Sequence, residues 1–428
     1  MERYSEYKDS GVKWLGKIPS HWELIKSKYL WKEQFATSEN GFEQLLSVSQ
    51  YDGITLAKGD SRSESLKGYK LVSKDDLVIN IMLAWMGGLG VSNHDGIVSP
   101  AYCIYRLTGN SNPKYLHYLY KTPLYLAEFA RHSTGVIPSR WRMYTDDFGQ
   151  VLSLIPPRKE QDAIVSYLDE RMGKIDTAIA QQQKMIDLLN ERKQIIINKA
   201  VTKGLDPNVK MKPSGIDWIG EIPEHWEIKR LKHILNIFGR IGFRGYNASD
   251  LVDEGEGAIT LSPSNMKPQG MAYEKCSYLT WNKYYESPEI MVNNGDILFV
   301  KTGSTYGKIC LVTKLPMEAT INPQLVIFKD FKCDNVFLSF FLQSQIIKKQ
   351  VEITVIGGTI PTISQEKIMN YVVVLPPIEE QKKIVEKILF MIKPVDDEIN
   401  NCSDLIALLQ ERKQIIINDV VTGKVKVV

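Results

Sequence analysis

The sequence has no hydrophobic run long enough to span a membrane, and charged residues dominate its first nine positions. A membrane helix needs about 20 consecutive apolar residues, and a secretory signal needs an apolar stretch of its own. Neither pattern occurs, so we expect a cytoplasmic protein.

Cysteine is also scarce. The five cysteines are an odd number, are widely separated and form no Cys-x-x-Cys pair: Cys103, Cys276, Cys310, Cys333 and Cys402. No histidine-rich spacing accompanies them, so the ligand pattern of a zinc site is missing. We expect reduced thiols and no metal bound to this chain.

A strong net charge is absent too, because the 428 residues sum to only +3. Dedicated nucleic-acid-binding domains often carry a strongly basic patch, so net charge alone indicates no such partner here. Locally, however, Arg131, His132, Arg140 and Arg142 crowd around Trp141. This mixture suits phosphates and base faces, although an ordinary solvated loop has a similar composition.

The strongest signal is an internal repeat. Residues 10–23, SGVKWLGKIPSHWE, recur at 214–227 as SGIDWIGEIPEHWE, an offset of 204 residues. Residues 156–161, PPRKEQ, recur at 376–381 as PPIEEQ, and 189–198, LNERKQIIIN, recur at 409–418 as LQERKQIIIN, both at an offset of 220. The chain is therefore a tandem duplication with similar ends and divergent middles, the second middle being 16 residues longer.

Each middle predicts a mixed α+β domain. Short strands are expected at 77–81 and 97–107 in the first copy and at 296–301 and 325–328 in the second, between Gly, Asn and Pro. One late helix is expected at 113–131 or 336–351, followed by a closing strand at 151–155 or 371–375. The Pro-Pro pair then starts a helix, with Glu160 or Glu380 near its positive end.

The helical tails carry apolar residues spaced alternately by four and three, the seam of a coiled coil. In the first copy the seam is Ile175, Ile179, Gln182, Ile186, Leu189, Lys193, Ile196 and Ala200. In the second it is Val395, Ile399, Cys402, Ile406, Leu409, Lys413, Ile416 and Val420. Pro394 predicts a short helix, a bend and then a long helix, because proline removes an intrahelical hydrogen bond.

Two copies of one stripe on one chain can satisfy each other about a pseudo-twofold axis, which sets the helices antiparallel. Lys193 and Lys413 would interrupt the seam and favour one register. A helix of about 26 residues is roughly 39 Å long, comparable with the ~34 Å of one DNA turn. The alternative is that each stripe packs against its own globular domain.

Several motifs resemble nucleotide-binding or catalytic sites but lack residues that such sites need. Residues 303–309, GSTYGKI, have three residues where a phosphate loop needs four between its glycines, and Ile309 replaces the magnesium-binding Ser/Thr. The segment is instead suited to a DNA-facing loop, or to a plain hairpin turn. His21-Trp22 and His225-Trp226 have no triad or metal spacing nearby, so we expect them to pack.

Residues 322–324, Asn-Pro-Gln, lack the second proline of the amino-methyltransferase motif, and no glycine-rich cofactor loop precedes them. We therefore expect no methyltransferase activity in this chain. The amide of Gln324 can pair with the N6 and N7 edge of adenine, and Arg140 and Arg142 can contact guanine or phosphate.

In its repeated Gly-x-Ile-Pro-x-His-Trp openings, Pro-Pro-x-x-Glu-Gln helix starts and Glu-Arg-Lys-Gln helix ends, the whole chain resembles the specificity subunits of type I restriction-modification systems. The resemblance implies target-recognition domains at 1–157 and 206–377, each contacting one half of a split asymmetric DNA site. It implies conserved helical spacers at 158–205 and 378–428.

The resemblance further implies double-stranded DNA, two adenine methyltransferase subunits and motor-nuclease subunits as partners. S-adenosylmethionine, ATP and magnesium would be held by those partners, and this chain would be non-catalytic. Phosphate contacts by the partners would explain why a DNA-reading chain is nearly neutral.

The candidate DNA-binding residues are Trp85, Arg131, Ser139, Arg140, Trp141 and Arg142 in the first domain, and Lys301, Thr302, Ser304, Tyr306, Lys308, Gln324, Thr359 and Thr362 in the second. Two other functions stay open: a scaffold that holds two copies of a protein partner without DNA, and a stand-alone DNA enzyme such as a nuclease. The scaffold predicts salt-insensitive binding, and the enzyme needs an acidic metal cluster or nucleophile that the sequence does not reveal.

Overall fold

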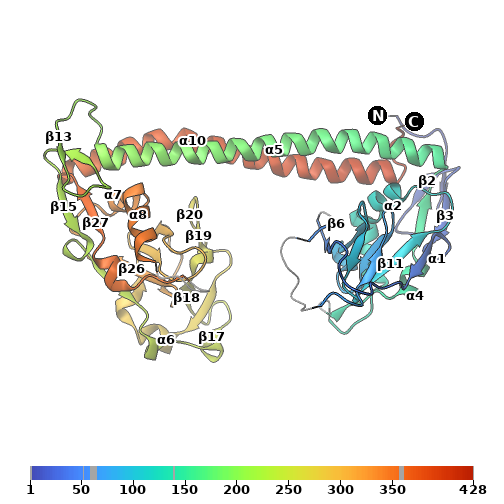
Figure 1. Ribbon diagram of the computed structural model, residues 1–428, viewed down its shortest axis with the longest axis horizontal. Coiled ribbons are helices and arrows are strands. Elements are labelled where there is room, and N and C mark those ends of the chain that lie inside the picture. Colours follow the sequence, from blue (N-terminus) through green and yellow to red (C-terminus); the bar gives the residue numbers. More distant parts are fainter. Residues whose placement is uncertain (1, 52, 58–64, 138–139, 356–360, 428) are drawn as a thin grey trace. The chain divides into compact units, whose positions relative to one another are not determined.

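A computed structural model describes residues 2–51, 53–57, 65–137, 140–355 and 361–427. The chain forms two compact units, which are described separately: unit 1 is Met1–Gln183 with Ser403–Val428, and unit 2 is Lys184–Cys402. Each unit holds one mixed α+β domain together with a segment of both long helices (Figure 1).

Unit 1 is built on a four-stranded antiparallel sheet in the order β4 (Trp31–Gln34), β11 (Tyr102–Leu107), β8 (Leu77–Asn80) and β9 (Leu89–Val91). Alternate residues of a strand point to opposite faces. Leu77 and Ile79 accordingly join the core that contains the helices, whereas Val78 joins a smaller cluster on the other face. That face is covered by two antiparallel pairs, β5 (Leu46–Ser49) with β6 (Gly53–Leu56), and β7 (Lys70–Val72) with β10 (Gly96–Val98).

The helices of unit 1 are α1 (Ser27–Leu30), α2 (Pro113–Tyr120), α3 (Pro123–Arg131) and α4 (Thr145–Gln150). The prediction of one helix over 113–131 was wrong. The chain breaks at Thr122, whose hydroxyl accepts a hydrogen bond from the Tyr125 amide at 3.3 Å, and Pro123 has no N–H with which to continue the first helix. The predicted strand over 97–107 is likewise two strands, β10 and β11.

Unit 2 repeats the central sheet in the order β16 (Asn236–Gly239), β26 (Leu325–Lys329), β23 (Ile297–Val300) and β24 (Ile309–Leu311). Its second face carries a five-stranded sheet instead of two pairs: β17 (Leu251–Val252), β21 (Ser277–Thr280), β18 (Gly257–Leu261), β25 (Ala319–Ile321) and β22 (Met291–Val292). The short pair β19 (Met266–Lys267) and β20 (Gly270–Met271) lies beside β24. The longer middle of the second copy therefore enlarges this face and leaves the central sheet order unchanged.

The helices of unit 2 are α6 (Trp281–Tyr285), α7 (Asn335–Phe341), α8 (Gln345–Thr354) and α9 (Gln365–Met369). The single helix predicted over 336–351 is again two helices. Both domains close on a two-stranded pair, β3 (Glu23–Lys26) with β12 (Leu152–Ile155) and β15 (Glu227–Arg230) with β27 (Val372–Leu375). The repeated openings form β1 (Tyr7–Asp9) with β2 (Lys17–Pro19) and β13 (Met211–Pro213) with β14 (Glu221–Pro223).

The two long helices are α5 (Arg158–Lys203) and α10 (Ile378–Val421), and each is continuous. The predicted break at Pro394 was wrong, since α10 passes through this residue. The loss of one hydrogen bond is offset by packing on either side, where Ile392, Val395 and Ile399 are buried. The short helix and the long helix that were predicted around Pro394 therefore form one continuous helix.

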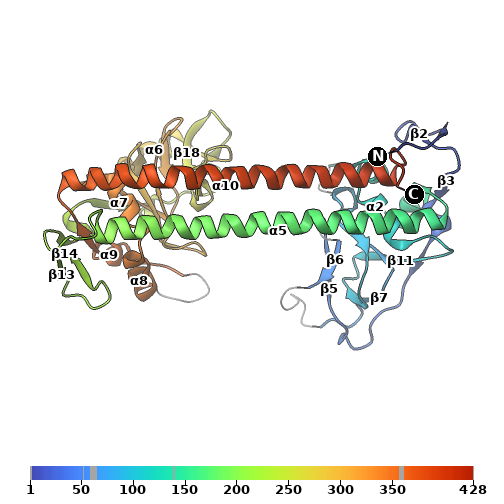
Figure 2. The same cartoon turned by 90° about the horizontal axis from the view of Figure 1, so that it is seen from above.

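Within each unit, α5 and α10 lie alongside each other as an antiparallel coiled coil (Figures 1 and 2). The predicted seam is confirmed. Each seam residue of α5, from Ile175 to Ala200, and each seam residue of α10, from Val395 to Val420, is buried or half-buried. Packing against a globular domain, the alternative to helix pairing, also occurs at the helix ends. Ala200 joins the core of unit 2, and Val420 joins the core of unit 1. One stripe thus serves helix pairing in its middle and domain packing at its end.

Candidate DNA interface and the scaffold that holds it

The repeated Pro-Pro-x-x-Glu-Gln motif forms a joint between each long helix and its domain. The side chain of Gln161 accepts the Asn112 amide at 2.7 Å and donates to the Pro156 carbonyl at 2.8 Å. Gln381 does the same with the Asp334 amide and the Pro376 carbonyl, both at 2.8 Å. Both glutamines are buried, so they satisfy backbone groups that would otherwise lack partners.

The glutamate of the same motif holds the His-Trp turn. His21 Nε2 lies 2.9 Å from Glu160 Oε2, and His225 Nε2 lies 2.7 Å from Glu380 Oε2. The histidines are thus engaged in structural contacts, next to the fully buried rings of Trp22 and Trp226.

The second carboxylate oxygen has a different donor in each unit. The Trp226 indole N–H donates to Glu380 Oε1 at 3.2 Å, whereas the Tyr4 hydroxyl occupies Glu160 Oε1. The Trp22 Nε1 has no hydrogen-bond partner among the residues that the structure describes. These contacts join residues about 150 positions apart, so sequence reasoning had no signal for them.

The seam lysines each have an acidic partner on the other helix. Lys193 Nζ lies 2.6 Å from Asp396 Oδ1 in unit 2, and Lys413 Nζ lies 2.6 Å from Asp176 Oδ1 in unit 1. The two pairs are equivalent under the 220-residue offset and require the same register. Each cation is thereby compensated inside a mostly apolar seam.

In unit 2, three segments that are separate in the sequence meet at the end of the central sheet. The loop 301–308 joins β23 to β24, which form an antiparallel hairpin. The Lys301 amide donates to the Gln324 carbonyl at 2.9 Å, and its carbonyl accepts the Ile363 amide at 2.8 Å. Thr302 pairs with Thr362 in an isolated bridge. The loop 301–308 is therefore the turn of a hairpin, and the segments that carry the candidate residues Gln324 and Thr362 lie beside it.

The side chains of this cluster are arranged for polar contacts. Burial lowers the pKa of Lys301, and no hydrogen bond or ion pair joins its ammonium to the rest of the described chain. The Asn322 side-chain amide donates to Gln324 Oε1 at 3.0 Å, which orients an exposed side chain. Lys308 is an exception among the candidates, because its ammonium donates to the Met266 carbonyl and is directed toward β19.

Unit 1 has an equivalent loop, 81–88, between β8 and β9. The Met86 amide donates to the Leu83 carbonyl at 3.0 Å, as the Tyr306 amide does to the Gly303 carbonyl at 3.1 Å. Gly87 and Gly307 both have positive φ, 88° and 79°. We call 81–88 and 301–308 the reading loops. They share this turn but not their side chains, which are Met-Leu-Ala-Trp-Met at 82–86 and Thr-Gly-Ser-Thr-Tyr at 302–306.

The predicted aromatic pair of unit 1 is close together. The rings of Trp85 and Trp141 are 5.3 Å apart at 68°, an edge-to-face contact, and the Trp85 indole N–H donates to the Met82 carbonyl at 3.2 Å. The Met143 amide donates to the Ile81 carbonyl at 3.0 Å, matching the Ile363 to Lys301 bond of unit 2. The segment ending at Met143 therefore lies beside its reading loop.

The predicted arginines differ in their availability. Arg131 forms hydrogen bonds of 2.6 and 2.8 Å with Glu128, so its charge is compensated within the domain. Arg142 donates to the Trp141 carbonyl at 2.8 Å, and Arg140 is exposed. Neither has a carboxylate partner among the described residues. Ser139 and Thr359 lie outside the described residues.

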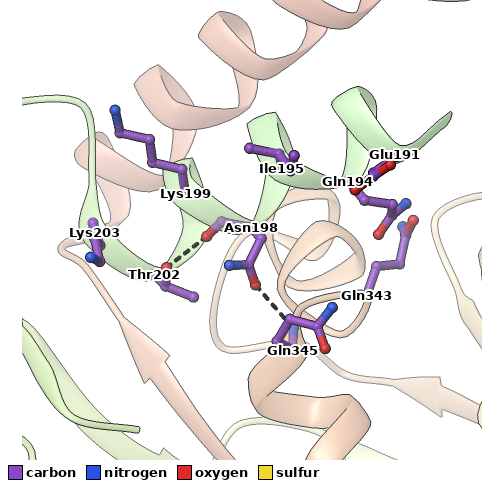
Figure 3. Close-up of a pocket in the computed structure, with 9 residues that line it drawn as sticks. All are labelled: Glu191, Gln194, Ile195, Asn198, Lys199, Thr202, Lys203, Gln343 and Gln345. Carbon is purple, nitrogen blue, oxygen red and sulfur yellow. Dashed lines mark hydrogen bonds between the residues drawn. The ribbon is translucent and has the colours of Figure 1, made fainter. Parts of the chain in front are cut away.

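A polar groove lies at the C-terminal end of α5 in unit 2 (Figure 3). Asn198 Oδ1 accepts the Gln345 amide at 3.0 Å and so holds the start of α8, while Gln194 and Gln343 face each other across the groove. Ile195 borders the groove and is exposed. The groove therefore adjoins an apolar part of the helix surface.

Two features are absent from the described residues, a metal site and a membrane-spanning helix. They contain no group of three or more His, Cys, Asp or Glu side chains that could hold a metal ion. None of their helices combines the length and the apolar character needed to cross a membrane.

Two loop-bearing α+β domains and a pair of antiparallel helices define a tandem-repeat protein. Residues 223–402 match the family model of the type I restriction modification DNA specificity domain. The chain is thus similar to type I restriction-modification specificity subunits, and the match to the family model lies in its second domain and the helix that follows.

Three relatives from Methanocaldococcus jannaschii illustrate the likeness. The chain is 28% identical over 278 residues to the type I restriction enzyme MjaVIII specificity subunit, covering 64% of this chain and 62% of that protein. It is 22% identical over 366 residues to the MjaIX specificity subunit, covering 84% and 76%. The match to a further specificity subunit of this organism spans 59% of its length. The chain thus aligns with about three fifths of two of these relatives.

A solved structure from a study of assembly and conformational transition of the type I restriction-modification system has the same fold, with a TM-score of 0.62 at 14% identity. The superposition covers 95% of this chain and 99% of that one.

Proposed function

We propose that this chain supplies the DNA sequence specificity of a type I restriction-modification complex, each domain contacting one half of a bipartite asymmetric duplex site. The observation that carries the proposal is the pair of reading loops. They occupy equivalent positions and share a turn, yet differ in nearly every side chain. Two copies of one scaffold with different contact residues are what two unlike half-sites require.

We propose that the chain is non-catalytic and that two methyltransferase subunits dock along the helices, with motor-nuclease subunits added for restriction. Exposed apolar residues support two equivalent docking stripes, one in each unit. The stripes are Met185, Leu188 and Ile195 on α5, and Leu405, Leu408 and Ile415 on α10. Each residue of the first matches one of the second at an offset of 220, and repeated apolar stripes mark repeated partner contacts.

We further propose that S-adenosylmethionine, ATP and magnesium are held by those partners, and that the paired helices set the spacer between the half-sites. The seam ion pairs support the second point, because they oppose any sliding of α5 against α10. A change of helix length should therefore change the tolerated spacer or prevent assembly.

The test is a methylome. The chain is expressed with its methyltransferase subunit, and N6-methyladenine is mapped by single-molecule sequencing with and without it. We expect a split asymmetric motif that disappears when this chain is deleted. Exchange of residues 24–150 for those of another family member should then change one half-site only. Unchanged methylation with an active, bound partner would favour the protein scaffold instead.

A further inference from the structure

Unit 1 exposes an apolar surface around its reading loop. We call it the Trp85 patch; it comprises the half-buried rings of Trp85 and Trp141 and five exposed residues: Met82, Leu83, Met86, Val136 and Ile137. Val136 is 96% exposed, so it adds almost nothing to the core of the domain. The ring contact between Trp85 and Trp141 makes the loops that carry these residues neighbours, and exposed apolar residues gathered on one surface mark a site that binds a partner.

The reading loop of unit 2 has the opposite character. None of the described residues of 301–308 and 322–324 is an exposed large apolar side chain. The loop exposes Ser304 and Thr305, and it also carries the half-buried Lys301 and Thr302. The two reading loops are therefore suited to different kinds of contact, although they hold equivalent positions on the same scaffold.

The charges around the Trp85 patch favour DNA as its occupant. Arg140 and Arg142 flank Trp141 in the sequence, and neither has a carboxylate partner among the described residues. An apolar centre with a cationic rim complements base edges between two phosphate backbones. A protein partner would have to provide both an apolar knob and an acidic border.

We propose that unit 1 contacts its half-site through the apolar parts of the bases, either thymine methyl groups or unstacked base faces, whereas unit 2 contacts its half-site through hydrogen bonds from its polar loop. The inference rests on the proposed DNA-specificity function and adds the mode of recognition to it. The two halves of the site are then bound with different dependence on salt and on base methyl groups.

Each mode has a measurable signature. Removal of a buried methyl group weakens binding about fourfold, so replacing thymine by uracil in the half-site of unit 1 should lower affinity by that factor per contacted base. Loss of an apolar side chain leaves the salt dependence unchanged, because no counterion release is lost. Loss of a phosphate contact at Lys301 would reduce the slope of log K against log salt by about 0.9.

The experiment uses the full chain assembled with its methyltransferase subunits and a duplex containing the motif found by the methylome. The variant is Met86→Ser with Val136→Ser, and the control is Leu251→Ser, an exposed residue on β17 of unit 2. Lys301→Gln serves as the polar comparison. Affinity is measured over a salt series, on duplexes with uracil in one half-site at a time, and on duplexes with 2-aminopurine to report unstacking.

We expect the double variant to bind about tenfold more weakly with an unchanged salt slope, and the control to bind like the wild type. Uracil in one half-site should weaken the wild type but not the double variant if methyl groups are contacted. An increase of 2-aminopurine fluorescence that the double variant lacks would identify base faces instead.

Three results would overturn the proposal. They are unchanged affinity of the double variant, a wild type indifferent to uracil and without unstacking, and weaker DNA binding that is caused by loss of the methyltransferase subunits. The proposed function itself would survive all three, since it fails only when the wild-type complex shows no sequence preference.

Discussion

The seam ion pairs permit a quantitative test of the helix pairing. The side chain of Lys193 is 18% exposed and that of Asp396 is 40% exposed, whereas Lys413 and Asp176 are 29% and 53% exposed. Exposed ion pairs contribute about 0.2–1 kcal/mol, and breaking a fully buried pair costs about 3–5 kcal/mol. We therefore expect Asp396→Ala to cost about 1–2 kcal/mol and Asp176→Ala about 0.5 kcal/mol.

A double-mutant cycle isolates the interaction from other effects of each substitution. Lys193→Met keeps an unbranched side chain of similar length, so it should be neutral or stabilising in an apolar seam. The free energy of unfolding in urea is measured for Lys193→Met, Asp396→Ala, the double variant and the wild type, and likewise for Lys413 and Asp176. We expect a coupling of about 1 kcal/mol for the first pair and less for the second. No coupling in either pair, or a larger one in the more exposed pair, would refute the reasoning.

Three further predictions concern the core, the joint and the docking stripes. Burial lowers the pKa of His117 to about 4, against about 6.5 in an unfolded chain, so protons bind the unfolded state better and stability should fall by up to roughly 3 kcal/mol between pH 6.5 and 4. His117→Ser, which copies Ser339 at the same distance from the helix cap in unit 2, should abolish this pH dependence of the urea midpoint; an unaltered profile would contradict it. Gln381→Ala should cost about 1–3 kcal/mol in the same assay because two buried backbone groups lose their partner, whereas Gln410→Ala on the exposed surface of α10 should have little effect. Leu188→Glu and Leu408→Glu should each remove one methyltransferase subunit from the assembly, as measured by native mass spectrometry, and equal stoichiometry in variants and wild type would exclude the stripes.

The repeat made much of the fold predictable. Two equal stripes at coiled-coil spacing indicated helix pairing, and the Pro-Pro pairs indicated where α5 and α10 begin. The prediction failed at Pro394 because local propensity was weighed without the packing on both sides of it. It failed at Thr122 because the apolar period continues across a cap and a proline, so α2 and α3 looked like one helix.

The side-chain contacts of the candidate site could be predicted less well from the sequence. Asp176 and Asp396 lie beside the seam and not in it, so the heptad pattern did not single them out as lysine partners. The direction of Lys308 depends on β19, which belongs to a distant part of the sequence. Loop composition indicates which types of side chain a loop offers for contacts, but the orientation of each side chain is decided by its tertiary neighbours.

The reading loops also differ in one backbone feature that limits how their sequences can be exchanged. Gly303 has a φ of +107°, whereas the equivalent Leu83 has a φ of −122°. A leucine in the left-handed region costs about 1–2 kcal/mol, so grafting Met-Leu-Ala-Trp-Met onto 302–306 should destabilise unit 2 by that amount. A graft that retains Gly303, Met-Gly-Ala-Trp-Met, should avoid this cost. If both grafts unfolded at the same urea concentration, the strain at position 303 would not be the constraint. Exchange of whole domains preserves each loop with its own backbone, which explains why a duplicated scaffold can diverge in its middle while its joints stay alike.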